Sequence, residues 1–185
     1  MKVSIVNFSG RRNGNCHDIA CFVVEMLANT YETMLFEMSD IDVNPCGKCN
    51  YECLDAPDDC PVDDDIASIY TALCESDLIY FVVPNYINNP NAYFFILNER
   101  KQGIFGRKPD LLEHYLKIEK KFVVVSNTKS DSFQQIFKGH VKNKPLADDI
   151  LFLATKDFEK GGIRGGLMEN KQAQQLLGDF ISKCR

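Results

Sequence analysis

The stretch that decides the fold is Val3-Ser4-Ile5-Val6-Asn7-Phe8-Ser9-Gly10-Arg11-Arg12-Asn13-Gly14-Asn15, which continues through residues 16–27. Residues 3–8 have the apolar, β-branched composition of a buried strand. Over residues 17–27, apolar side chains recur at i, i+3 and i+4, which predicts a helix with one buried face. A buried strand followed by a short turn and a helix is the opening unit of an α/β fold.

The turn itself, residues 9–15, has the composition of an anion-binding loop. It combines small polar residues with two glycines and two arginines, directly before a helix N-terminus that attracts anions. It lacks the G-x-G-x-x-G fingerprint of dinucleotide-binding folds, and no Lys-Ser or Lys-Thr pair follows Gly14 as in a Walker A loop. The loop suits a terminal phosphate monoester such as that of FMN, and an ordinary strand-to-helix turn is the alternative interpretation.

Length and charge narrow the class of protein. A chain of 185 residues is most simply one domain, residues 1–185, with a substantial core. The formal net charge of -5 and the lack of a basic stripe argue against nucleic acid and anionic membrane as partners. No apolar run approaches the roughly 20 residues of a membrane span. The residues after Met1 do not resemble a signal peptide, so we expect a cytoplasmic protein.

The rest of the chain alternates apolar runs with amphipathic segments. Further strands are expected over residues 33–38, 77–83, 122–125 and 150–154, and helices over residues 66–74, 92–99, 111–116, 133–138 and 169–183. Asp63-Asp64-Asp65 is expected to supply exposed carboxylates before the helix that follows. The expected fold is α/β, a flavodoxin-like, doubly wound five-stranded parallel sheet of order 2-1-3-4-5.

Three polar loops are expected to meet at one edge of this sheet. They are residues 9–15, 84–89 and 126–128, which are rich in Asn, Ser and Gly and include the aromatic Tyr86. Ligands of such sheets bind beyond the carboxyl ends of the strands, where the strand order reverses. The sequence therefore predicts one polar pocket at this edge.

Four of the eight cysteines gather in a polar segment after the second strand. Cys46, Cys49, Cys53 and Cys60 follow the pattern C-x2-C-x3-C-x6-C. In a reducing compartment such a cluster indicates a metal or redox site rather than disulfides. Four thiolates can ligate a 4Fe-4S cluster or a structural Zn2+, and free thiols are the third alternative.

These segments resemble the NAD(P)H-dependent FMN reductase family of flavodoxin-like proteins. The family's Ser-Pro-Arg-x-x-Gly-Asn-Thr phosphate loop is similar to residues 9–16, where Gly10 replaces Pro and Cys16 replaces Thr. Its Asp-Asp, Ala-Asp, Pro-x-Tyr and Asp-Arg landmarks resemble, in order, Asp64-Asp65, Ser76-Asp77, Pro84-Asn85-Tyr86 and Glu99-Arg100. The resemblance covers roughly the first two thirds of the chain and weakens beyond residue 101.

The resemblance implies that FMN binds at the three loops. Its phosphate would be held by Ser9, Arg11, Asn13, Asn15 and Cys16. Its isoalloxazine ring would be lined by Pro84, Asn85, Tyr86 and Ile87, and the pocket would be closed by Ser126 and Asn127. The flavin carries the hydride chemistry, so no catalytic side chain is expected.

The family also implies an activity and partners. The expected enzyme transfers hydride from NADH or NADPH to FMN and passes electrons to a quinone, flavin, metal or protein acceptor. The alternative is an electron-transfer or redox-sensing flavoprotein without a small-molecule acceptor. Some members, the iron–sulfur flavoproteins, carry a compact cysteine motif after the second strand, which favours a 4Fe-4S cluster here. The gap at residues 50–52 is one residue longer than usual in that group.

Flavin faces in this family are often covered by a neighbouring subunit. Residues 87–95 with Ile104 and Phe105 offer apolar side chains near the expected pocket. We therefore expect a homodimer or tetramer with closed, symmetric contacts.

Overall fold

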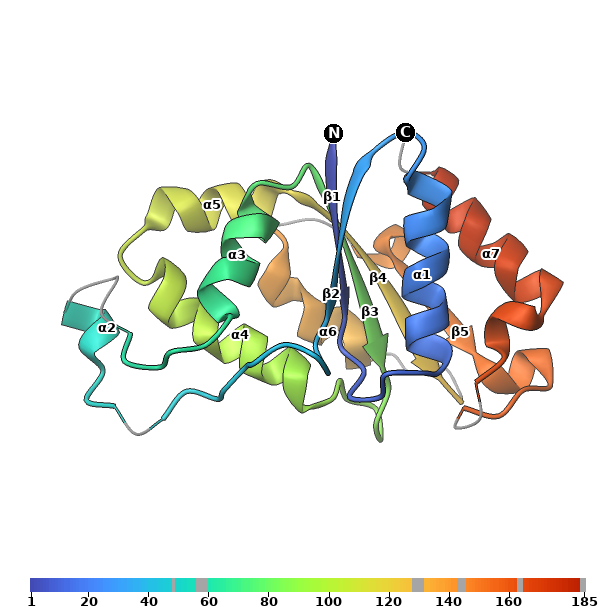
Figure 1. The fold of residues 1–185 in the computed structure, drawn as a ribbon, viewed down its shortest axis with the longest axis horizontal. Coiled ribbons are helices and arrows are strands. Elements are labelled where there is room, and N and C mark those ends of the chain that lie inside the picture. Colours follow the sequence, from blue (N-terminus) through green and yellow to red (C-terminus); the bar gives the residue numbers. More distant parts are fainter. Residues whose placement is uncertain (48, 56–59, 128–131, 143–145, 163–164, 184–185) are drawn as a thin grey trace.

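The computed structural model describes residues 1–47, 49–55, 60–127, 132–142, 146–162 and 165–183. Five parallel strands form one sheet of order β2-β1-β3-β4-β5 (Figure 1). The strands are β1 (Lys2–Asn7), β2 (Glu32–Glu37), β3 (Leu78–Pro84), β4 (Glu119–Ser126) and β5 (Ile150–Ala154). The predicted fold class and strand order are confirmed.

Helices cover both faces of the sheet (Figure 1). On one face lie α1 (Asn15–Leu27) and α7 (Lys171–Ser182). On the other lie α3 (Ile66–Cys74), α4 (Ala92–Phe105), α5 (Pro109–Lys117) and α6 (Ser132–Phe137). The short α2 (Glu52–Asp55) interrupts the cysteine segment, and 3-10 turns span Lys138–His140, Ala147–Asp149, Thr155–Phe158 and Leu167–Glu169. Among the described residues, no helix is long and apolar enough to cross a membrane.

The strand residues supply two hydrophobic cores, one on each face. Ile5 packs in the core under α1 and α7, whereas the next residue, Val6, packs in the core under α3 to α6. Every residue of β3 is buried, as expected for a central strand of a parallel sheet covered on both sides. This is why β3 is a continuous apolar run rather than an alternating one.

An aromatic cluster fixes the start of α4 beside the first loop. The ring of Phe8, just beyond β1, lies edge-on to Phe81 and Phe94 at centroid distances of 5.4 and 5.2 Å. Such pairs add about 0.5–1.5 kcal/mol each beyond simple burial. The Asn91 side chain also donates to the Phe8 carbonyl. The end of β1 and the N-terminus of α4 are thereby held together.

Candidate functional site

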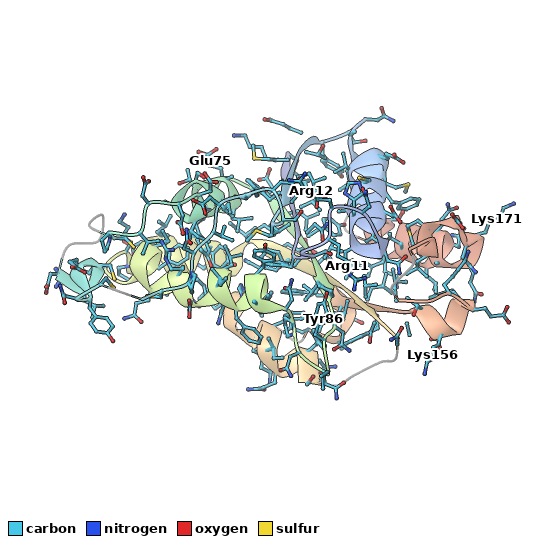
Figure 2. The ribbon with its side chains drawn as sticks, turned by 60° about the horizontal axis from the view of Figure 1, so that its bottom comes forward. Arg11, Arg12, Glu75, Tyr86, Lys156 and Lys171 are labelled. Carbon is cyan, nitrogen blue, oxygen red and sulfur yellow. The ribbon has the colours of Figure 1, made fainter. Side chains whose placement is uncertain are left out.

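A cavity of about 240 Å3 lies at the carboxyl ends of the central strands. Nine of the predicted residues line it: Ser9, Arg11, Asn15, Cys16, Pro84, Asn85, Tyr86, Ser126 and Asn127. Asn13 and Ile87 are not among its lining residues. Figure 2 brings this edge of the sheet forward and shows Arg11 and Tyr86 near each other there. The described residues of the three loops therefore come together as predicted, whereas residue 128 of the third loop lies outside the described residues.

The first loop leads into an uncapped helix N-terminus. Gly14 has φ +140°, a conformation that favours glycine, and α1 begins at the next residue. No side chain of the described residues caps the helix there, so first-turn N–H groups are left for a ligand. Ser9 shapes the loop, because its N–H donates to Asn7 Oδ1 at 3.0 Å and its Oγ accepts from the Arg11 N–H at 3.1 Å. The geometry is that of an anion site.

Cys16 lies in the first turn of α1 and is buried. Burial, reinforced by the Glu37 carboxylate, raises the pKa of its thiol to about 12. The side chain is therefore a neutral thiol at physiological pH, and its S–H is a weak donor. It can contact an anion without adding a negative charge.

Two asparagines at the cavity have half-satisfied side-chain amides, Asn15, which is buried, and Asn85, which is partly buried. Asn15 Oδ1 accepts from the Leu167 N–H at 3.0 Å, and Asn85 Nδ2 donates to Ser126 Oγ at 2.8 Å. The other amide atoms, Asn15 Nδ2 and Asn85 Oδ1, are buried without a hydrogen-bond partner in the described part of the chain. A buried polar group without a partner costs about 1–3 kcal/mol. Both residues line the cavity, so a ligand with complementary groups would satisfy them.

Glycines after β5 close the pocket from the C-terminal side. A Cβ on Gly162 would lie only 2.6 Å from Asn127 Oδ1, and one on Gly165 would lie 3.7 Å from Gly14 Cα. Gly162 lines the cavity together with Val125, and neither residue was predicted from the sequence to belong to the site.

A strained hairpin stands beside the cavity. Tyr86 and Asn89 exchange backbone hydrogen bonds of 2.8 and 3.1 Å, and the residues between them, Ile87 and Asn88, have φ of 51° and 62°. Positive φ is rare for a β-branched residue, and Ile87 is also 93% exposed. Strain of this kind persists where function requires a particular loop shape.

The four cysteines gather along one side of α4, away from this cavity. A Cβ on Gly103 would lie 4.0 Å from the sulfur atoms of both Cys53 and Cys60. The Cys46 N–H donates to Glu99 Oε1 at 2.6 Å. Burial, followed by the nearby Cys49 thiol, raises the pKa of Cys46. The cysteines thus share one neighbourhood.

The surroundings of the cysteines leave room for a metal centre. Cys60 lines a cavity of about 690 Å3 and Cys46 one of about 480 Å3, and Pro61 lines both. Within the described ranges, no group of three or more His, Cys, Asp or Glu side chains is close enough to hold a metal ion. Thiolates repel one another until a metal offsets their charge. The four thiols are a suitable donor set for a metal–thiolate centre, but each cavity is lined by one of them and they are not assembled around one point in this structure.

The first half of the chain matches a known family. A profile of the NADPH-dependent FMN reductase family matches residues 1–95, from the first strand through the Tyr86 hairpin. The chain belongs to this family. The match includes the phosphate-type loop, the cysteine segment and the hairpin, so it covers two of the three loops around the cavity.

Relatives of this reductase-family chain agree with that assignment. An iron-sulfur flavoprotein from Methanosarcina thermophila is 32% identical over 101 residues, 54% of this chain and 52% of that protein. The alignment thus spans about half the length of this curated relative.

Two solved structures share the fold. RosB, which contains the bound intermediate 8-demethyl-8-formylriboflavin-5'-phosphate, superposes with a TM-score of 0.70 at 14% identity, over 98% of this chain and 76% of RosB. NAD(P)H:quinone oxidoreductase from Methanothermobacter marburgensis superposes with a TM-score of 0.58 at 11% identity, over 99% of this chain and 96% of that protein.

Proposed function

We propose that the cavity binds FMN and that the protein is an FMN-dependent NAD(P)H oxidoreductase. The observation that carries the proposal is the pair of half-satisfied amides, Asn15 and Asn85, on opposite loops of one cavity at the carboxyl edge of the sheet. Isoalloxazine and phosphate groups together offer the donors and acceptors that these atoms lack. Family membership supports the same ligand.

The roles of the residues follow from their positions. The first-turn N–H groups of α1, with Ser9 and Arg11, would hold the phosphate, while Asn85 Oδ1 would accept from a ring N–H. The other residues proposed to bind FMN divide into two groups. Those near the phosphate would be Asn13, Asn15 and Cys16, and those near the ring would be Pro84, Tyr86, Ile87, Ser126 and Asn127. FMN supplies the hydride chemistry when bound, and the chain orients it and limits access of water.

The type of electron acceptor distinguishes the proposed enzyme from the alternative, an electron-transfer or redox-sensing flavoprotein. A quinone, free flavin, metal or protein acceptor fits an enzyme, whereas a cysteine-bound centre would equally serve an electron-transfer or redox-sensing flavoprotein. Steady-state oxidation of NADH and NADPH with each acceptor class separates the two. Turnover with a small acceptor supports the enzyme, and reduction of the flavin without turnover favours the alternative.

We further propose that Cys46, Cys49, Cys53 and Cys60 ligate a 4Fe-4S cluster. Support comes from the shared neighbourhood of the four thiols, the adjoining cavities and the similarity to an iron-sulfur flavoprotein. Structural zinc and free thiols are the alternatives. A cluster would connect two-electron flavin chemistry to a one-electron acceptor.

One preparation tests both cofactors. Protein purified without oxygen should contain flavin, iron and acid-labile sulfide. Zinc without sulfide would point to a structural clamp, and absence of all metals would leave four free thiols. Absence of flavin binding in an FMN titration would remove the flavin proposal independently of the metal result.

We also propose a homodimer or tetramer that covers the flavin site. Tyr86 and Ile87, in the hairpin at the cavity, and Phe95, on α4, are exposed and offer apolar contacts. Phe94 and Phe105, from the stretch expected to contribute, are instead buried in the core, because their rings pack against other core aromatics. Sedimentation showing only monomer at micromolar concentration would refute the assembly.

A further inference from the structure

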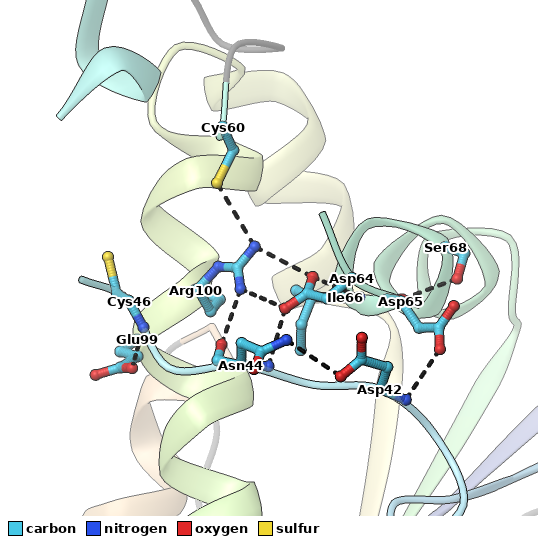
Figure 3. Close-up of polar contacts among 10 residues, drawn as sticks. All are labelled: Asp42, Asn44, Cys46, Cys60, Asp64, Asp65, Ile66, Ser68, Glu99 and Arg100. Atoms are coloured by element: carbon cyan, nitrogen blue, oxygen red, sulfur yellow. Dashed lines mark hydrogen bonds and ion pairs between the residues drawn. The ribbon is translucent and has the colours of Figure 1, made fainter. Parts of the chain in front are cut away.

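Arg100 is a buried cation on the cysteine side of α4. Its side chain is only 5% exposed, and it pairs with Asp64, whose side chain is 1% exposed (Figure 3). Nη1 donates to Asp64 Oδ2 at 2.6 Å and Nη2 to Asp64 Oδ1 at 3.3 Å. The two-pronged pairing fixes the plane of the guanidinium.

The same guanidinium reaches both ends of the cysteine segment. Nη1 also donates to the carbonyl of Asn44, before the first cysteine, at 2.8 Å. Asp64, after the last cysteine, accepts from the Asn44 N–H at 2.9 Å. Arg100 and Asp64 therefore tie residues 44 and 64 together on α4. We call this group of three residues the segment clamp.

One contact of the Arg100 guanidinium is not part of the segment clamp. Nη2 points to Cys60 Sγ at 3.5 Å (Figure 3). A charged donor at this distance stabilises negative charge on the sulfur. Next to it on the same helix, Glu99 accepts from the Cys46 N–H. Two adjacent residues of α4 thus hold the first and last cysteines.

A buried ion pair alone is a poor source of stability, because desolvation offsets much of its attraction. A salt bridge that only closed a loop could be replaced by apolar side chains. The contact with Cys60 gives this arginine a second role that an apolar residue could not take over. The geometry points to that role.

We propose that Arg100 is a positioning residue for the metal centre, holding Cys60 as a ligand and stabilising negative charge on its sulfur. This inference rests on the proposed cluster in the cysteine segment. Hydrogen bonds to cluster sulfurs and nearby positive charge favour the reduced, more negative form. Arg100 should therefore both retain the metal and raise the reduction potential of the centre.

The test needs a variant that removes the cation without leaving Asp64 as an unpaired buried charge. Arg100→Met combined with Asp64→Asn meets this need, because Asn Oδ1 can still accept from the Asn44 N–H. Arg100→Lys keeps the charge but loses the forked geometry. Lys101→Gln is the matched control, since this neighbouring cation on α4 donates to the Gly139 carbonyl instead.

Each protein is purified without oxygen and assayed for FMN, iron and sulfide, for loss of iron to a chelator, and for the midpoint potential of the centre by EPR-monitored titration. Loss of an outer-sphere partner typically weakens metal binding by about 10–100-fold. We expect such a loss, and a lower potential for any remaining centre, in the double variant. FMN content should stay at the wild-type level, Arg100→Lys should be intermediate, and Lys101→Gln should match wild type.

Two results would overturn the inference in different ways. If wild type holds the centre and the folded double variant keeps the same iron content and potential, Arg100 is a structural ion pair only. If wild type holds flavin but neither iron, sulfide nor zinc, the proposed centre fails and the role of Arg100 fails with it. Loss of flavin across all variants would instead count against the FMN site.

Discussion

The variant Asn85→Ala tests whether the unsatisfied side-chain oxygen of Asn85, which lowers the stability of the ligand-free protein, serves to bind FMN. In the ligand-free protein the change removes a neutral hydrogen bond to Ser126, worth about 0.5–1.5 kcal/mol. It also removes the buried Asn85 Oδ1, whose lack of a partner in the described chain costs about 1–3 kcal/mol. These terms oppose each other, so the ligand-free free energy of unfolding should change by between about −0.5 and +2.5 kcal/mol, which is at most a small loss.

With FMN bound, the substitution is expected to be unfavourable. Under the proposed role of Asn85 Oδ1 as acceptor for a flavin N–H, the variant would leave that N–H buried without an acceptor, which should weaken binding by about 1–3 kcal/mol. At 1.4 kcal/mol for each factor of ten, the dissociation constant should rise by about 5- to 150-fold. Quenching of flavin fluorescence measures the affinity, and urea unfolding with and without FMN measures the two stabilities.

The control for this experiment is Asn29→Ala, at an exposed asparagine in the turn after α1. It should change neither affinity nor stability appreciably. Equal destabilisation of the ligand-free and FMN-bound Asn85→Ala protein, with unchanged affinity, would show that Asn85 serves only the fold.

Three further predictions follow from single side chains. Arg11→Ala should weaken FMN binding by about 1.5–3 kcal/mol through loss of a charge-assisted phosphate contact, and equal FMN and riboflavin affinities in wild type would contradict this role. Ile87→Gly should stabilise the protein by about 1 kcal/mol in urea unfolding, because glycine tolerates the φ of 51°; destabilisation would refute the strain. Burial lowers the pKa of Lys120 to about 7. Between this value and the higher pKa of Lys120 in the unfolded chain, the unfolded chain binds more protons than the folded protein does. The free energy of unfolding should therefore rise with pH above about 7, by at most about 1.4 kcal/mol per pH unit. Urea unfolding at several pH values should show that Lys120→Met flattens this rise.

The strand pattern and the loops around the cavity were readable from the sequence because they depend on local composition. Near-continuous apolar runs marked β1 and β3, and their ends placed the polar loops at one edge. The beginning of β4 was not readable, because it contains Lys120 and Lys121. Lys121 is buried there by pairing with Asp149 at 2.7 Å, a partner 28 residues away.

Long-range contacts also explain the other differences between the features predicted from the sequence and the structure. Asp64 was expected to be exposed in an acidic run, but its side chain is buried because Arg100 arrives from another helix. Gly162 reaches the cavity only because the chain after β5 returns over the first loop. No local pattern encodes either approach, since each depends on the finished packing of distant elements.

The segment clamp makes the cysteine segment an almost self-contained insert. Its two ends meet through the 2.9 Å hydrogen bond between Asn44 and Asp64, so the sheet receives the same two anchor points whatever lies between them. Doubling the length of a loop closed in this way costs only about 0.6 kcal/mol in chain entropy. Evolution could therefore lengthen, shorten or re-space the cysteines while leaving the flavin pocket intact, and the same junction is a natural place to graft a different redox module.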